Sequence, residues 1–199
     1  MDALVARTRA RLPGRTRRVV PPGPLVRAAV LVPVVDQGEA CLVFAQRSER
    51  VGHHAGQISF PGGRIDPGDA DDLQAALREA EEEVGLAPAK VEALGALDDT
   101  ETVATQFVIT PWVGVVRGPV VWQPDGHEIA KVIEVPVAAL LDRGSFRVER
   151  WQRDGVAREV YFYDYRDDTI WGATARILKQ YLDLIVPSVA GGAPPCPSR

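Results

Sequence analysis

One stretch decides the fold of this chain, Gly62 to Leu86, with the sequence GGRIDPGDADDLQAALREAEEEVGL. It begins with a glycine pair and a turn-forming Asp-Pro-Gly run, and it continues into a segment typical of an amphipathic helix. We predict the helix from Asp71 to Val84, with Gly85 as its C-terminal cap. On a wheel of about 100° per residue, its apolar side chains gather in one predicted buried stripe: Leu73, Ala76, Leu77, Ala80 and Val84.

Three glutamates of this helix share one flank of the wheel. Glu79, Glu82 and Glu83 stand at positions i, i+3 and i+4, where like charges repel one another. That arrangement brings no structural gain unless a cation offsets the repulsion. Carboxylate oxygens at this density suit Mg²⁺ or Mn²⁺, which also bind phosphate oxygens. The alternative is a solvated acidic helix face, because charge runs are often only exposed surface.

Two neighbouring features favour the metal hypothesis. A Gly62-Gly63 turn that opens toward a helix would let backbone N–H groups approach an anion closely. Arg78 lies four residues before Glu82 and could hold a carboxylate in place by a bidentate contact. Together these features predict a site for a phosphorylated ligand beside the helix.

The rest of the chain predicts strands and one further main helix. Apolar runs typical of strands occupy residues 25–35, 40–46, 91–97, 107–116, 130–135 and 160–165, with a short strand at 58–60. A helical turn is predicted at 137–141 and a second amphipathic helix at 173–185. Strands mixed with two main helices indicate one layered α/β domain.

The two ends of the chain differ in composition from its middle. Residues 1–24 carry six arginines, and we predict a solvated N-terminal helix and basic arm, with an organelle presequence as the alternative. Residues 187–199, with four prolines, are predicted to be a disordered tail. The functional domain is therefore expected at residues 25–186.

Composition argues against several broad classes of function. The net charge of −4 disfavours sequence-independent nucleic-acid binding, which needs a basic surface. No run of about 18 apolar residues is present, so no membrane span is expected. Of the two cysteines, Cys41 lies in an apolar run and Cys196 in the tail, so we expect no disulfide and a reducing, cytoplasmic location.

The opening stretch resembles the Nudix box, whose general pattern is G-x5-E-x7-R-E-U-x-E-E-x-G-U, with U an apolar residue. The half from Arg78 to Leu86 matches in full. Asp69 stands where the pattern has Glu, and eight residues rather than seven separate it from Arg78. This departure is similar to the coenzyme A pyrophosphatase branch of the family. The resemblance implies a Nudix-type α/β/α sandwich with a mixed β-sheet.

A second motif, just before the box, is similar to the same branch, whose signature resembles L-L-T-x-R-[SA]-x3-R-x3-G-x3-F-P-G-G. This chain has Arg47-Ser48, Gly56 and Phe60-Pro61-Gly62-Gly63 at the matching spacing. It lacks the leading Leu-Leu-Thr, and Gly52 occupies the second Arg position. Segments 108–111, 134–136 and 170–176 also look like that branch, so the resemblance covers roughly residues 25 to 185.

The resemblance implies a role for each candidate residue. Glu79, Glu82 and Glu83 would ligate Mg²⁺ or Mn²⁺ on the substrate pyrophosphate, with Glu79 and Glu83 the leading catalytic pair. Arg78 would hold a carboxylate, and the general base would be Glu79 or Glu128. The backbone of Gly62 and Gly63 would contact substrate, as would loop side chains, of which Arg47 matches the motif: Arg47, Arg50, His53, His54 and Gln57. Trp112, Trp122, Trp151 and Trp171 are expected to be core or rim aromatics rather than base-stacking platforms.

Coenzyme A or a derivative is the substrate that the resemblance implies, with 4′-phosphopantetheine and adenosine 3′,5′-bisphosphate as products. The 3′-phosphate would call for an extra cation in the pocket. NADH or ADP-ribose is the alternative within the family, and a catalytically inactive ligand sensor is the alternative from another class. Strand edges and exposed tryptophans would permit a homodimer without requiring one.

Overall fold

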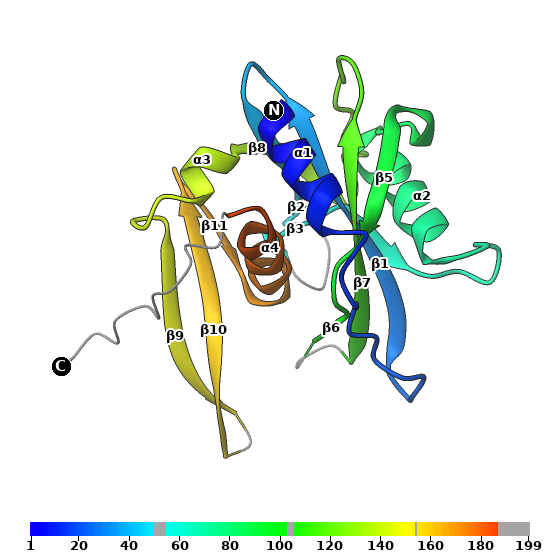
Figure 1. Cartoon of the computed structure of the whole chain (residues 1–199). Helices are drawn as coiled ribbons and strands as arrows, with labels where there is room; N and C mark the ends of the chain where they lie inside the picture. The colour runs from blue at the N-terminus through cyan, green and yellow to red at the C-terminus, as the bar shows by residue number, and fades with distance from the viewer. Residues whose placement is uncertain (50–54, 103–105, 154, 187–199) are drawn as a thin grey trace.

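A mixed eight-stranded sheet forms the middle layer of the protein (Figure 1). The computed structural model describes residues 1–49, 55–102, 106–153 and 155–186. The main path of the sheet runs through β3 (Ile58–Ser59), β2 (Ala40–Arg47), β1 (Val26–Asp36), β7 (Phe107–Val116) and β5 (Val91–Ala96). Three further strands pair beside it: β4 (Gly62–Arg64) with β1, β6 (Thr100–Glu101) with β7, and β8 (Ile129–Pro136) with β2. Only the β1–β7 pairing is parallel among these described strands, which makes the sheet mixed.

Helices cover both faces of this sheet. On one side lies α2 (Asp72–Val84), and on the other lie α1 (Asp2–Arg11) and α4 (Gly172–Ile185) (Figure 1). Two short pieces complete the helices that the structure describes: the 3₁₀ turn η1 (Pro88–Lys90) and α3 (Val137–Leu140). The expected α/β/α sandwich with a mixed sheet is therefore confirmed. Within the described ranges, no helix has the length and apolar character needed to cross a bilayer.

A second, three-stranded antiparallel sheet stands beside α4, in the order β11 (Asp168–Trp171), β10 (Val156–Tyr165) and β9 (Phe146–Arg153) (Figure 1). The pattern predicted only the end of β10. It missed β9 because charged residues interrupt the strand, which is largely exposed. Strand β11 has only four residues, too few for a periodic signal. Pairing with β10, rather than local pattern, makes both segments strands.

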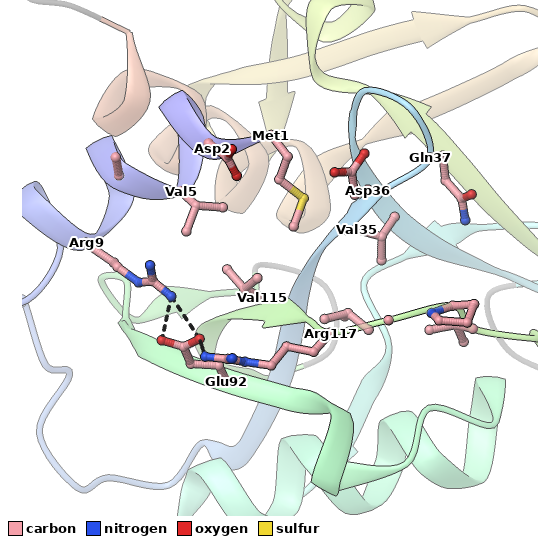
Figure 2. A pocket seen from close by; sticks show the side chains of 15 residues that line it. Met1, Asp2, Val5, Arg9, Val35, Asp36, Gln37, Glu92, Val115 and Arg117 are labelled. Atoms are coloured by element: carbon pink, nitrogen blue, oxygen red, sulfur yellow. Dashed lines mark hydrogen bonds and ion pairs between the residues drawn. The ribbon is translucent and has the colours of Figure 1, made fainter.

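The N-terminal helix belongs to the core, and our expectation of a solvated helix was wrong. Val5 of α1 and Leu12, the C-cap of this helix, are buried, and the hydroxyl groups of Thr8 and of Tyr181 in α4 lie 3.1 Å apart. The Arg11 guanidinium donates to carbonyl groups at the end of α4, and Arg9 pairs with Glu92 of β5 at 2.7 Å (Figure 2). An arginine-rich composition alone did not reveal the apolar side of this helix, which faces α4.

The basic arm after α1 is also held in place, through one buried carboxylate. Asp99 is fully buried and accepts hydrogen bonds from Arg17 at 2.5 Å and from Thr110 at 2.9 Å through one oxygen. Its other oxygen accepts from the Val20 N–H at 2.9 Å and from Arg27 at 3.3 Å. These contacts tie residues 17–20 to the edge of the main sheet.

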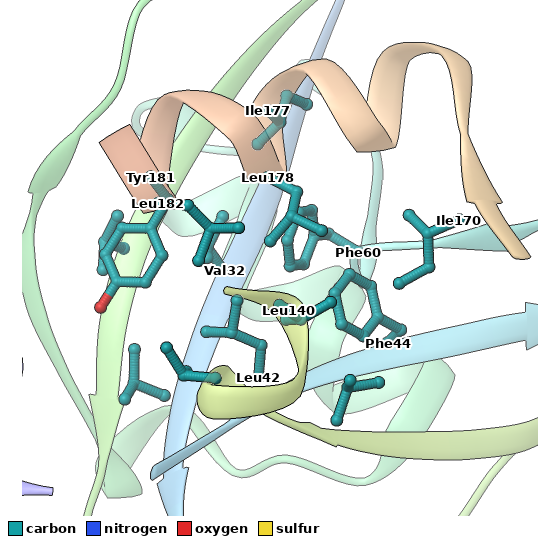
Figure 3. Close-up of a cluster of buried hydrophobic side chains, with 14 of the residues drawn as sticks. Val32, Leu42, Phe44, Phe60, Leu140, Ile170, Ile177, Leu178, Tyr181 and Leu182 are labelled. Atoms are coloured by element: carbon teal, nitrogen blue, oxygen red, sulfur yellow. The ribbon is translucent and has the colours of Figure 1, made fainter. Parts of the chain in front are cut away.

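The main sheet has an apolar core on each face because successive residues of β1 point to opposite sides. Ala29, Leu31 and Val35 face α2, whereas Val30, Val32 and Val34 face α4. A strand buried on both faces is a continuous apolar run, as β1 is. Figure 3 shows the larger cluster, where Val32 and Phe44 of the sheet lie beside Leu178 and Tyr181 of α4.

We predict that Asp99→Asn lowers the free energy of unfolding by about 2–4 kcal/mol at pH 7, because breaking a buried ion pair leaves arginines without their charged partner. Urea denaturation measures the difference. Equal stability of parent and variant at pH 7 would show that this cluster does not hold the arm.

The same difference should depend on pH. Burial is the largest single influence on the pKa of Asp99 and raises it, but the hydrogen bonds from Arg17, Val20 and Thr110 together outweigh burial and hold the pKa below its ordinary value. A lowered carboxylate pKa contributes stability above the unfolded-state pKa, and that stability is lost as pH falls through the folded-state value. The advantage of the parent should therefore begin to shrink below about pH 4, near the unfolded-state pKa, and be lost as pH falls through the lower folded-state pKa.

Candidate functional site

Helix α2 approaches the main sheet closely because its buried face is made of small residues. Ala75, Ala76 and Ala80 are fully buried against β1. Asp71 caps the N-terminus by accepting from the Gln74 N–H at 2.8 Å, and Gly85 ends the helix with a left-handed φ of 73°. The helix begins one residue later than predicted, with Asp71 as its N-cap, and the predicted end at Val84 with its cap at Gly85 is confirmed.

The observed buried face of α2 differs from the predicted stripe. It is rotated about the helix axis toward the flank that carries Glu79 and Glu83. Ala76, Ala80 and Val84 are buried as expected, but Leu73 and Leu77 are only partly buried. Ala75 and Glu83 take their place in the interior. The wheel missed this rotation because it scores a glutamate as outward-facing, whereas Glu83 has a buried hydrogen-bond partner.

That partner is the backbone of β4. The Glu83 side chain accepts a hydrogen bond from the Gly62 N–H at 3.0 Å, and the residue is only 8% exposed. The pKa of Glu83 is raised to about 7, mainly by burial and also by the carboxylates of Glu79 and Glu128, against the lowering effects of the Gly62 hydrogen bond and Arg47. Glu83 is therefore the buried member of an acidic cluster, which consists of Asp69, Glu79, Glu82 and Glu83 and whose negative charges are only partly offset.

Both glycines of β4 are required by close packing. A side chain at Gly62, where φ is 151°, would place its Cβ 2.3 Å from the Ala29 carbonyl oxygen of β1. A Cβ at Gly63 would lie 2.5 Å from the carboxylate carbon of Glu79. The pair was expected to form a turn with N–H groups open to a ligand. That expectation was wrong, because both residues pair with β1 and the Gly62 N–H binds Glu83.

Arg78 holds the outer part of the same cluster. Its guanidinium makes a bidentate contact with Asp69, with both N–O distances at 3.0 Å. It also donates to Glu79 at 2.9 Å and to Glu82 at 3.2 Å. The expected contact with Glu82 exists, but the bidentate partner is Asp69, the residue that departs from the family pattern. The hydrogen bond from Arg78 is the main reason that the pKa of Asp69 is lowered.

The donor set of α2 suits a divalent cation. The pKa of Glu79 is raised, mainly by burial and also by Glu82 and Asp66, although Arg78 lowers it, and Glu79 and Glu83 lie one helical turn apart. Across the described part of the chain, no three Asp, Glu, His or Cys side chains form a ready-made metal cage. Glu82 is turned to Arg78 and its side chain is 62% exposed. Glu79 and Glu83 therefore fit as the inner pair, and Glu82 would have to leave Arg78 to join them.

Glu128 reaches this cluster from the turn before β8. Its carboxylate pairs with Arg47 at 3.2 Å, and its carbonyl oxygen accepts from the Ser48 N–H at 2.7 Å. Both Glu128 and Arg47 act electrostatically on Glu83. The Nε atom of Arg47 is buried and has no hydrogen-bond partner among the described residues. Arg47 therefore places a positive charge at the acidic cluster, and its Nε–H donor is not used by any described residue.

A cavity of about 380 Å³ opens beside the cluster, between the main sheet and the three-stranded sheet. Four predicted site residues line it: Arg47, Gln57, Gly62 and Gly63. The predicted Arg50, His53 and His54 lie outside the described residues. At the opposite side, the cavity meets residues that the sequence did not single out for a site: Trp151, Arg158, Tyr161, Trp171 and Arg176.

These additional residues come from elements that only the tertiary structure brings to the site. The rings of Trp151 and Trp171 lie 5.8 Å apart, and Trp151 is 45% exposed, as expected of a rim aromatic. Trp112 and Trp122 instead donate hydrogen bonds to Asp72 and Glu134. The one signal that could have found part of this wall is the segment Ile170–Arg176, which carries Trp171 and Arg176.

A larger cavity, of about 840 Å³, lies beside α1 and does not contain the predicted chemistry (Figure 2). Met1, Val5 and Val115 give it apolar walls, and its Arg9 and Arg117 both pair with Glu92. No predicted site residue lines it. The smaller cavity, which adjoins the acidic cluster, is therefore the candidate active site.

Comparison with known proteins agrees with this geometry. A model of the NUDIX domain family matches residues 25–173. Two relatives, from Salmonella paratyphi B and Salmonella newport, are each described as an uncharacterized Nudix hydrolase NudL, and each is 39% identical over 154 residues, covering 77% of this chain and 80% of the relative. The crystal structure of a MutT/nudix family protein from Enterococcus faecalis aligns with a TM-score of 0.56 at 14% identity, over 84% of this chain and 64% of that one, and shares the fold.

We predict different effects for alanine at the two glycines of β4. Gly62→Ala should lower the free energy of unfolding by about 3 kcal/mol or more, because its Cβ meets backbone and its φ is strained. Gly63→Ala should cost about 1 kcal/mol, because its Cβ meets only the movable end of Glu79. Urea denaturation separates the two. Equal losses would contradict the packing described for β4.

We also predict that Glu83→Gln stabilises the metal-free protein at pH 8. A carboxylate whose folded-state pKa is raised destabilises the fold above that pKa, and the penalty disappears as pH falls toward the unfolded-state value. With a folded-state pKa of about 7 against 4.5, the variant should gain about 1–3 kcal/mol at pH 8. The gain should shrink between pH 7 and pH 4.5. Thermal or urea unfolding in a chelator tests this, and a less stable variant at pH 8 would contradict it.

Proposed function

The chain belongs to the Nudix hydrolase family, and from that premise we propose that it hydrolyses the pyrophosphate bond of coenzyme A or a coenzyme A derivative. Water attacks one phosphorus atom, the bond from that atom to the bridging oxygen breaks, and the bridging oxygen leaves with the electron pair. The products are 4′-phosphopantetheine and adenosine 3′,5′-bisphosphate. The observation that carries the proposal is a cavity whose wall includes Gly62 and Arg47, which contact Glu83 and Glu128, and also the separate arginines Arg158 and Arg176.

We assign Glu79 and Glu83 as the inner ligands of Mg²⁺ or Mn²⁺, with Glu82 as the outer one. When bound, the cation would neutralise phosphate charge and favour ionisation of a bound water. Arg78 supports this arrangement by holding Glu79 and Glu82 from the outer side. Arg47 would contact the pyrophosphate, since its guanidinium lines the cavity beside Glu83 and keeps a buried donor.

Of the two candidate bases, we favour Glu128. Glu79 is held by Arg78 and is needed as a ligand. The Glu128 side chain is 51% exposed, pairs with Arg47 and lies within electrostatic reach of Glu83. In this proposal a Glu128 carboxylate oxygen accepts the proton that the attacking water loses, as a general base within hydrogen-bond reach would.

Arg158 and Arg176 favour coenzyme A over NADH or ADP-ribose. Coenzyme A carries a 3′-phosphate that those two compounds lack, and this phosphate requires a cation separate from Arg47. Arg158 is an exposed residue of β10 on the cavity wall, and Arg176 lies near the start of α4 and donates to the Glu101 carbonyl oxygen at 3.0 Å. Arg158 is the better candidate for the 3′-phosphate because no hydrogen bond to the fold is described for it.

We predict that the purified protein with Mg²⁺ or Mn²⁺ hydrolyses coenzyme A faster than NADH and ADP-ribose. Product identification by mass spectrometry should find 4′-phosphopantetheine and adenosine 3′,5′-bisphosphate. Glu83→Gln should fold and lose nearly all turnover, since it removes a ligand charge. A sensor would instead turn over no substrate and keep its ligand affinity in that variant. Faster hydrolysis of ADP-ribose or NADH would contradict coenzyme A as the substrate and identify that compound as the substrate instead.

Dephospho-coenzyme A is the matched substrate for the same assay, because it lacks only the 3′-phosphate. Arg158→Gln should raise KM for coenzyme A by about 10- to 100-fold, the range of a lost charge-assisted hydrogen bond. Its KM for dephospho-coenzyme A should change by less than about threefold. The same change for both substrates would exclude a contact between Arg158 and the 3′-phosphate.

A further inference from the structure

We propose that Asp125 is a positioning residue that holds Glu128 toward the carboxylates of α2. The inference rests on the proposed function, because it gives Glu128 the role of base. Asp125 was not among the residues that the sequence singled out. It lies three residues before Glu128, in the turn that leads into β8.

The Asp125 carboxylate organises this turn through backbone hydrogen bonds. Its Oδ1 atom accepts from the N–H groups of His127 at 3.2 Å, Glu128 at 3.0 Å and Ile129 at 2.7 Å. Its Oδ2 atom lies 3.1 Å from the Glu128 nitrogen. Burial opposes ionisation of Asp125 most strongly, yet these N–H groups together lower its pKa. One carboxylate thus orders the backbone on both sides of Glu128.

The turn is anchored to the helix that carries the acidic cluster. The Asp125 N–H donates to the Glu83 carbonyl oxygen at 3.2 Å, and the Gln123 N–H donates to the Val84 carbonyl oxygen at 3.0 Å. At the other end, Ile129 is fully buried at the start of β8. The Asp125 carboxylate therefore joins two fixed points, and Glu128 lies between them.

Glu128 has few other restraints on its side chain. Its carboxylate pairs with Arg47 and is half exposed, and exposed ion pairs contribute little to holding one geometry. A general base has to stay within hydrogen-bond reach of the proton that it accepts. The Ser48 N–H holds the Glu128 carbonyl oxygen and Asp125 holds the Glu128 N–H, so ordering of the backbone by Asp125 is one of the two described restraints that position the base.

A matched pair of variants separates this role from turn stability alone. Asp125→Asn keeps an oxygen in the Oδ1 position, so its kcat should stay within about threefold of the parent value. Asp125→Ala removes every acceptor and should lower kcat by about 10- to 100-fold with little change in KM, because the loss falls on the chemical step. Both variants are assayed in the parent and in a Glu128→Gln background.

The double-mutant cycle decides the inference. If Asp125 acts through Glu128, Asp125→Ala should change kcat by less than about twofold once Glu128 is already Gln. The same loss in both backgrounds would overturn the proposal. Should Asp125→Ala unfold at the assay temperature, Asp125→Leu, which fills the space of the carboxylate and has no acceptor oxygen, takes its place under the same criterion.

Hydrogen exchange provides a readout that needs no turnover. The amides of residues 127–129 should exchange faster in Asp125→Ala than in the parent and in Asp125→Asn. Unchanged exchange would overturn the proposal even if kcat fell. If the parent hydrolyses no coenzyme A, NADH or ADP-ribose, the proposed function has failed, while exchange still decides whether Asp125 orders the turn.

Discussion

The contact between helix α2 and strand β4 is the constraint on which the site depends. Alanines on α2 and glycines on β4 remove the side-chain bulk that would otherwise keep the two elements apart. At that distance the Glu83 carboxylate reaches the Gly62 N–H and becomes buried. A substitution that widens this contact would expose Glu83 and move Glu79, even if the helix and the sheet each remained intact.

The same contact places the carboxylates of Glu79 and Glu83 where burial disfavours their charged forms. Burial and mutual repulsion raise the pKa of both Glu79 and Glu83, whereas hydrogen bonding to Arg78 lowers that of Asp69. Strongly shifted carboxylates beside a cavity are typical of functional sites, although ion-pair networks can shift pKa values too. Here Arg78 partly offsets the charges of Asp69, Glu79 and Glu82, and in the proposed function a cation would offset the rest.

The three-stranded sheet has a different task from the main sheet. It adds Tyr163 and Ile170 to the core on the α4 side of β1, and with the start of α4 it forms one wall of the cavity. Its contributions to the cavity wall are aromatic and basic residues, among them Trp151 and Arg158. The acidic cluster is thus suited to chemistry on a pyrophosphate. The three-stranded sheet is suited to recognising the groups that are attached to the pyrophosphate.

The amino-acid sequence by itself determined helix α2, its C-terminal cap, its acidic flank and most strands of the main sheet, because periodicity and capping are local properties of the chain. The pairing of β9 and β11, the burial of α1 and the Gly62–Glu83 contact were decided by the tertiary structure. Each of these brings together residues distant in the chain, so their local pattern contains no sign of the partner. For the same reason Arg158 and Asp125 emerged as site residues only once the two sheets and the turn before β8 were in place.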